Sequence, residues 1–365
     1  MDFITTNGTL INDSDYSDYI TDYPIPVIPK WGFWAKFLST PVIVLVGIIG
    51  NVLSFLVMKT KTLRRKTYSH YLCALAVLDT FTLIFRQVES VDEYFVSYRK
   101  TKGIFQNFDD GSCKLYNFLA HVITLMCSWL VVFMAVERVV AVRYPFKRVY
   151  FRRETGAGVA ICILFVVVCL TQSFRLFMIE HIVYDEQNNI HDCLASDMYI
   201  EIYTSLDVYF FLWALVFVLP VVLITVCNIT VICHIIRVRK DLRMKDDYLT
   251  YKVDRARWRR NRSTVMLLIV TFLYIITLLP LFTLSLIVDV TIKVGSIETA
   301  RNTYVALRPF IDLSVSISLL NYAVNFFVYI LSGKRFRYEL RKLFIKKRFI
   351  KRRFTVKSTR EEILK

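Results

Sequence analysis

Long apolar stretches recur along the 365-residue chain, separated by shorter polar segments. About 20 predominantly apolar residues in a helix cross a bilayer core, and seven stretches reach that length. They cover residues 33–58, 71–96, 115–142, 157–179, 204–236, 263–290 and 305–331. They lack the polar face that a helix of a soluble protein needs, so the pattern predicts an all-α membrane protein, a seven-transmembrane helix bundle.

The basic residues gather in four of the segments between or after these stretches. Thirty-six of the 47 Lys and Arg residues fall in 59–70, 138–154, 234–262 and 333–365. Because basic loops stay on the cytoplasmic side, we expect a plasma-membrane protein with its N-terminus extracellular and its C-terminus cytoplasmic. The net charge of +17 then reflects topology, and no nucleic-acid partner is expected.

This topology divides the chain into four parts. The first part is an acidic extracellular tail with glycosylation sequons at Asn7 and Asn12. The third is a short amphipathic helix after the seventh span, in which apolar residues recur every four positions. The expected parts are the tail 1–31, the seven-helix domain 32–332, the amphipathic membrane-surface helix 333–346 and a basic cytoplasmic tail 347–365.

Two of the eight cysteines fall in outward-facing segments on this map. Cys113 begins the third span and Cys193 lies between the fourth and fifth. Because the exterior is oxidising, we expect a disulfide between them. No close pair of Cys and His has the spacing of a metal site, so neither a metal nor a cofactor is expected.

Polar residues interrupt several spans. Asn51, Asp79, Asn321 and Asn325 lie at similar depths, which predicts a shared network around water or a cation. Glu137-Arg138 ends the third apolar run, and charges within or beside a membrane span are costly unless they serve a function. We therefore treat both groups as candidate functional sites.

Taken in order, these residues resemble the rhodopsin-like (class A) G-protein-coupled receptors over all seven spans. The motifs that carry the resemblance are Gly50-Asn51, Leu75-Ala76 with Asp79, Cys113, Glu137-Arg138, Tyr144-Pro145, Pro220, Pro280, and Asn325 with Tyr329.

The resemblance implies signal transduction without catalysis. An extracellular ligand would stabilise one conformation of the bundle, and that conformation would bind a heterotrimeric G protein. Arrestin, a receptor kinase and membrane lipid are further candidate partners. The implied activation switch consists of Glu137, Arg138, Asn228, Tyr329 and Pro280, and the implied sodium site of Asp79, Asn51, Asn321 and Asn325.

The chain departs from the family pattern in the sixth and seventh spans. Leu278 stands at the position of the family's Trp, Tyr274 at that of an inner Phe, and Phe326 at that of a Pro. Arg259-Arg260 replaces the Glu that pairs with the motif Arg in many relatives. Without that Glu the usual lock cannot form, so we predict signalling in the absence of ligand.

The ligand class is narrowed mainly by exclusion. Ala120 stands where amine receptors need an Asp, and the seventh span lacks the retinal-binding Lys of opsins. Charged and aromatic residues near the outer ends of the spans favour a peptide. Short segments are similar to invertebrate receptors of the FMRFamide and myosuppressin type. The candidate ligand contacts are Arg86, Ala120, His121, Arg175, Tyr209, Phe282 and Asp312.

Two alternatives stay open. A lipid-ligand receptor of the same family would suit the largely apolar outer bundle. A decoy or scavenger receptor that does not signal would suit the altered motifs. A transporter is disfavoured because the chain has no internally repeated halves, and an intramembrane enzyme because Asp79 has no acidic partner at its depth.

Overall fold

Seven helical segments, long and apolar enough to cross a membrane, form one bundle in the computed structural model of the chain. The structure describes residues 29–99, 101–143, 154–185, 190–243 and 248–345. The expected sites at Asn7, Asn12 and Tyr144-Pro145 lie outside these residues.

The predicted spans correspond to helices with somewhat different ends. In chain order the elements are α2 (Trp31–Met58), α3 (Lys61–Arg64), α4 (Thr67–Glu93), η1 (Tyr94–Arg99), η2 (Phe105–Asn107), α5 (Asp110–Arg143), α7 (Glu154–Gln172), α8 (Arg175–Met178), β1 (Ile179–Asp185), β2 (Ile190–Ala195), η3 (Asp197–Tyr199), α9 (Ile200–Thr204), η4 (Ser205–Val218), α10 (Leu219–Arg243), α11 (Tyr248–Val294), α12 (Ile297–Ala323) and α13 (Asn325–Ser332). A further helix covers 334–345.

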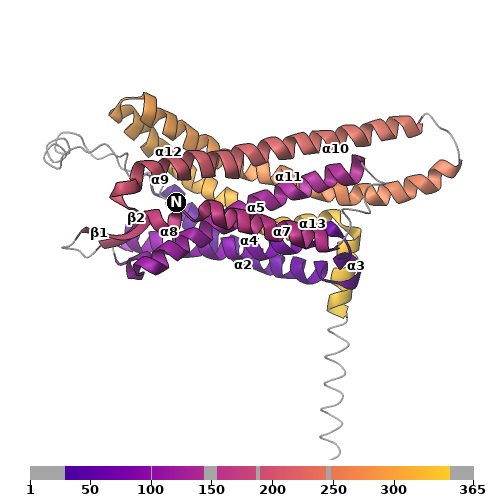
Figure 1. The fold of residues 1–365 in the computed structure, drawn as a ribbon, viewed down its shortest axis with the longest axis horizontal. Helices are drawn as coiled ribbons and strands as arrows, with labels where there is room; N and C mark the ends of the chain where they lie inside the picture. Colours follow the sequence, from indigo (N-terminus) through magenta and orange to yellow (C-terminus); the bar gives the residue numbers. More distant parts are fainter. Residues whose placement is uncertain (1–28, 100, 144–153, 186–189, 244–247, 346–365) are drawn as a thin grey trace, which may run out of the picture.

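The two ends of the bundle carry different structures. The antiparallel β1–β2 hairpin lies at one end and α3 at the other, with the long helices between them (Figure 1). We call these the hairpin end and the tail end. The sequence pattern predicted neither strand, because residues 179–195 have no clear alternation of apolar and polar positions. The fourth span accordingly ends at Met178, and Ile179 begins β1.

Apolar side chains cover the outside of the spans. Leu45 is 63% exposed, Leu170 is 70% and Ile276 is 60%. Large apolar surfaces of this kind are rare on soluble monomers, whereas lipid tails cover them in a membrane. The interior holds Leu72, Leu130 and other fully buried residues, together with the polar groups described below.

The seventh span is not continuous, contrary to the predicted helix over 305–331. The helix is interrupted at Val324, between α12 and α13, although Phe326 replaces the family's Pro. The Asn325 side chain donates to the Asn321 carbonyl oxygen at 3.3 Å and to Asp79 at 2.8 Å. The Asn325 amide thus supplies a donor to the Asn321 carbonyl oxygen at the interruption. The seventh span therefore bends here without a proline.

The first and seventh spans approach closely at glycines. A Cβ atom on Gly32 would lie 2.4 Å from the Pro309 Cα atom, and one on Gly50 would lie 3.0 Å from the Phe326 Cβ atom. Small residues allow such backbone contact between membrane helices. This contact places the polar residues of α12 against α2.

Candidate functional site

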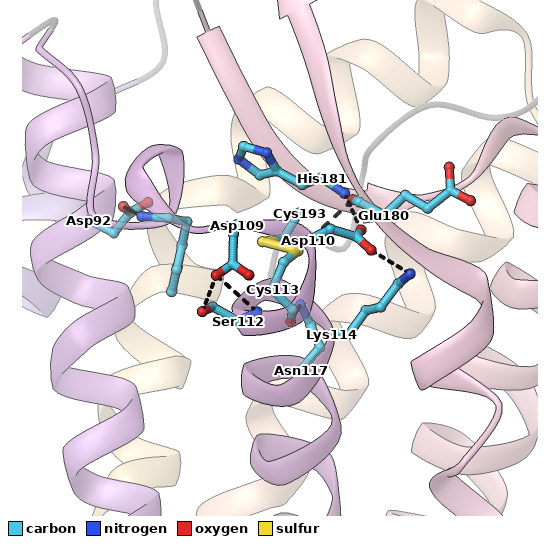
Figure 2. The surroundings of a disulfide bond; sticks show 11 residues. Asp92, Asp109, Asp110, Ser112, Cys113, Lys114, Asn117, Glu180, His181 and Cys193 are labelled. Carbon is cyan, nitrogen blue, oxygen red and sulfur yellow. Dashed lines mark hydrogen bonds and ion pairs between the residues drawn. A yellow bond between two sulfur atoms is a disulfide. The ribbon is translucent and has the colours of Figure 1, made fainter.

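The predicted disulfide joins α5 to the hairpin. Cys113, in the first turn of α5, is bonded to Cys193 of β2, which confirms the expected pair. The Asp110 carboxylate accepts a hydrogen bond from the His181 backbone N–H at 3.2 Å and forms an ion pair with Lys114 at 2.6 Å (Figure 2). The hairpin is therefore fixed over the start of α5 by a covalent bond and by the hydrogen bond from His181 to Asp110.

The start of α5 is stabilised by a capping carboxylate. Asp109 accepts hydrogen bonds from the Ser112 hydroxyl and, at 3.3 Å, from the Ser112 backbone N–H (Figure 2). The Ser112 hydroxyl, with nearby backbone N–H groups, lowers the pKa of Asp109. An ionised side chain at this position satisfies helix donors that have no partner within the helix, which is why α5 begins here.

Arg175, a predicted ligand contact, is completely buried at the hairpin end. Its guanidinium donates to Gln172 Oε1 at 2.9 Å, to the Tyr203 hydroxyl at 2.5 Å and to the Asp207 carboxylate. His121 Nε2 of α5 lies 3.9 Å from the same carboxylate. Arg175 thus orients Asp207 toward α5, and each of its three nitrogens donates to another group of the protein.

Arg86 and Glu89 form a second ion pair on α4, with 2.6 Å between Nη1 and Oε2. Arg86 lies within electrostatic range of Tyr322 of α12, and Glu89 lies within that range of His121 of α5. These charged side chains therefore face other spans and not lipid. Arg86, Glu89, His121 and Asp207 nevertheless retain 17%, 23%, 27% and 25% of their side-chain surface exposed.

A third charged group connects α2, α4 and α12. The Lys36 ammonium lies 2.6 Å from Glu93 and 2.7 Å from Asp312, while Arg308 lies 3.1 Å from Glu93 and 3.5 Å from Asp312. Asp312, a predicted ligand contact, is only 4% exposed. Four paired charges of opposite sign make this group a structural contact between three spans.

Three of the four polar residues predicted to share a network, Asp79, Asn321 and Asn325, are joined by hydrogen bonds of the Asn325 amide. The Asn325 amide donates to Asp79, and the Asn51 amide donates to the Tyr322 carbonyl oxygen at 3.0 Å. Cys127 of α5 lies 3.8 Å from the Thr82 hydroxyl on the same side. Within the described part of the chain, Asn51 Oδ1 is buried and has no hydrogen-bond partner.

Arg138 lies buried toward the tail end of α5. Its guanidinium is 3.7 Å from Glu137 and sits over the Tyr68 ring of α4, 4.9 Å from the ring centroid. Tyr329 of α13 is also buried and packs against Phe336, with 5.7 Å between ring centroids. Two of the expected switch residues, Arg138 and Tyr329, thus lie in the interior near the tail end. The sequence did not predict the contact of Arg138 with Tyr68.

Comparison with known proteins assigns the chain to a family. Residues 50–329 match the family described as 7 transmembrane receptor (rhodopsin family). The chain belongs to this family. It is therefore a receptor and not an enzyme.

Similar receptors are known from several animals. Growth hormone secretagogue receptor type 1 of Mus musculus is 24% identical over 344 residues, covering 92% of this chain and 89% of that receptor. The galanin-like G-protein coupled receptor npr-9 of Caenorhabditis elegans is 28% identical over 131 residues, or 36% and 28% of the two chains. The QRFP-like peptide receptor of Branchiostoma floridae is 22% identical over 282 residues, or 73% and 69%.

The other predicted ligand contacts of this rhodopsin-family receptor differ in exposure. Phe282 is 5% exposed and stacks on Phe217, with 4.0 Å between ring centroids. Tyr209 is 40% exposed, and the Lys293 ammonium lies 3.9 Å from its ring centroid. Ala120 is half-buried on α5, beside His121. Arg86, His121 and Tyr209 are thus at least partly exposed, whereas Phe282 is buried against Phe217.

The receptor's Asn228, predicted to belong to the switch, contacts α11 in the structure. Its amide donates to the Thr271 hydroxyl at 2.9 Å. Pro280 lies within α11, which continues on both sides of it. The side chains of Arg259-Arg260 lie outside the described part of the chain, so the predicted loss of the lock stays a prediction.

Sequence reasoning missed several residues of these groups. Lys36 had a recognisable signal, because a single basic residue within an apolar run must face a partner in the protein. Tyr68, Gln172 and Thr271 had none, since their roles depend on which neighbours the packing supplies. Among the described residues, no cluster of three or more His, Cys, Asp or Glu side chains could hold a metal ion.

Proposed function

We infer that this receptor binds an extracellular peptide at its hairpin end and activates a heterotrimeric G protein at its tail end. The observation that carries the inference is the partial exposure of Arg86, Glu89, His121 and Asp207 on interior faces of the spans. Groups of both charge signs, close to aromatic rings, suit the mixed polar and aromatic surface of a peptide. The relatives named for peptide ligands support the same inference.

A lipid ligand fits these groups poorly. Hydrocarbon placed against Arg86, Glu89 or Asp207 would remove their remaining water without replacing its hydrogen bonds. A peptide replaces that water with amides and polar side chains. The resemblance of this chain to FMRFamide and myosuppressin receptors remains a prediction about which peptide the receptor binds.

The tail end supports G-protein coupling through Arg138. On activation the guanidinium would leave Tyr68 and Glu137 and become available to the G protein. The basic segments of the sequence support a cytoplasmic C-terminus and an extracellular tail that carries Asn7 and Asn12. Arrestin and a receptor kinase would act on the same face, and the helix over 334–345 would lie against membrane lipid.

The polar network supports a sodium site. The Asp79 carboxylate, together with the buried Asn51 oxygen, offers ligands that suit a hard cation, whereas the Cys127 thiol is a poorer one. Agonist affinity should then change when sodium chloride replaces choline chloride at constant ionic strength. An affinity indifferent to this exchange in the unmodified receptor would contradict a sodium site.

The test is a screen of a neuropeptide library in cells, read by calcium and cAMP responses. Arg138→Ala should abolish the response to an active peptide while labelled peptide still binds. Glu89→Gln should weaken binding, whereas Lys114→Met, which alters an exposed ion pair beside the disulfide, should leave it unchanged. Activation by lipid extracts and not by peptides would contradict the peptide ligand, and binding without any G-protein response would identify a decoy receptor.

A further inference from the structure

The two ring nitrogens of His121 on α5 have different surroundings. Nδ1 lies 2.8 Å from the Asn117 carbonyl oxygen, one turn earlier on the same helix. A carbonyl oxygen only accepts hydrogen bonds, so Nδ1 carries a proton and Nε2 is an acceptor when the ring is neutral. Within the described part of the chain, no hydrogen bond reaches Nε2.

The Nε2 atom faces a second acceptor, the Asp207 carboxylate of η4. The distance from Nε2 to Asp207 Oδ1 is 3.9 Å, which is too long for a hydrogen bond. A protonated Nε2 would approach a carboxylate to about 2.8 Å, so the observed distance fits a neutral ring. Arg175 donates to the same Oδ1 and holds the carboxylate in place. Two acceptors from different spans thus face each other without a donor between them.

The charges around these two acceptors balance. Asp207 is paired with Arg175, and Glu89, which lies within electrostatic range of His121, is paired with Arg86. With a neutral His121 ring, the five side chains have no net charge. The site therefore accepts either a neutral or a cationic donor, whereas a carboxylate would add a third acceptor and a second negative charge beside Asp207.

We propose that His121 Nε2 and the Asp207 carboxylate form a donor-binding pair that recognises an NH2 group of the ligand, carried by a guanidinium or by a primary carboxamide. Acceptors 3.9 Å apart lie within reach of the two N–H bonds of one nitrogen. The two side chains keep 27% and 25% of their surface exposed, so the group can reach them. The inference rests on the proposed function and names the chemistry that the ligand presents to α5 and η4.

The pair should discriminate strongly against ligands that lack N–H donors. Such a ligand removes water from both acceptors and replaces none of its hydrogen bonds. A site built to hydrogen-bond a ligand NH2 group rejects analogues without it for this reason. Each hydrogen bond lost should weaken binding by about fivefold.

Four small aromatic probes test the pair without a peptide. Benzamide carries a neutral NH2 group and benzamidine a cationic one, whereas N,N-dimethylbenzamide has no N–H and benzoate offers only acceptors. Each probe is added up to its solubility limit to the purified full-length receptor, and the melting temperature is recorded against probe concentration. We expect benzamide, benzamidine or both to raise the melting temperature saturably, and the other two probes to leave it unchanged.

The matched variants change the acceptor on α5. His121→Phe keeps an aromatic ring without the acceptor, and it should raise the half-saturating concentration of an active probe at least about fivefold. His121→Leu is a second variant without an acceptor, and His121→Gln, whose amide oxygen accepts, should retain binding. Lys114→Met, about two turns away on the same helix, is the control and should leave binding unchanged. A cooperative melt without probe shows that each variant is folded.

The response to the two NH2 probes also identifies the ligand group. Protection by benzamide alone assigns it to a carboxamide, and protection by benzamidine alone to a guanidinium. Lack of protection by both probes, or equal protection by N,N-dimethylbenzamide, would overturn the donor-binding pair, as would unchanged protection in the folded His121→Phe or His121→Leu variant. The probes need neither a peptide nor a G protein, so they report on the pair even where the library screen contradicts the peptide ligand.

Discussion

The Lys36 ammonium of α2 lies 2.7 Å from the Asp312 carboxylate of α12, although 276 positions separate the two residues. Both side chains are largely buried, at 10% and 6% exposure. Because Glu93 and Arg308 complete the group, its charges balance inside the bundle. The first and seventh spans are thus joined by an ion pair as well as by close packing.

Replacing Lys36 with Met should destabilise the receptor. The substitution keeps the apolar stem but leaves Asp312 and Glu93 with a single shared cation, at a cost of about 3 kcal/mol. The melting temperature of the purified receptor in detergent should fall by several degrees. Lys114→Met breaks an ion pair whose Asp110 side chain is 54% exposed, and it should cost less than about 1 kcal/mol. An equal fall in melting temperature in both variants would show that burial of the Lys36 ion pair contributes nothing to stability.

Gly32→Ala should separate the first and seventh spans. The added methyl would lie 2.4 Å from the Cα and carbonyl oxygen of Pro309, and backbone atoms cannot move aside as a side chain can. We expect a loss of about 2 kcal/mol in stability. Gly158→Ala on α7 is the control, since nothing lies within 4 Å of its added methyl. The melting temperature should fall in Gly32→Ala and should not fall in Gly158→Ala.

The Asp79–Asn325 hydrogen bond should appear as coupling in a double-mutant cycle. Asp79→Asn and Asn325→Asp each change one side of a 2.8 Å contact, and the exchanged pair can form it again. We expect the double variant to be more stable than the sum of the two single effects by about 1 kcal/mol. Additive losses in thermal melting would mean that the two side chains act independently.

Reduction of the disulfide should lower both stability and ligand binding. The bond joins residues 80 positions apart. Closing a loop of that length lowers the entropy of the unfolded chain and so stabilises the folded receptor by up to about 4 kcal/mol. It also fixes the hairpin over α5, where the proposed ligand enters. Dithiothreitol should lower the melting temperature of the unmodified receptor, and it should leave the Cys113→Ser/Cys193→Ser variant unchanged. A similar shift in that variant would assign the effect to another group.

The sequence by itself determined the class of architecture. Seven apolar stretches of sufficient length can satisfy their backbone groups in a bilayer only as helices, so the number of spans followed from composition and length. The disulfide was also predictable, because Cys113 and Cys193 are the two cysteines outside the apolar spans. The meeting of Asp79 with Asn325 followed from their equal depth.

Only the tertiary structure decided which polar groups are satisfied by the protein and which remain open to a ligand. Arg175 and Asp312 looked like ligand contacts, yet packing buries them against partners far away in the sequence. The interruption at Val324 and the contact of Asn228 with Thr271 depend likewise on neighbouring spans. Periodicity and hydropathy report the environment of one helix, whereas hydrogen bonds between helices depend on their rotation and depth, which are set by packing of the whole bundle.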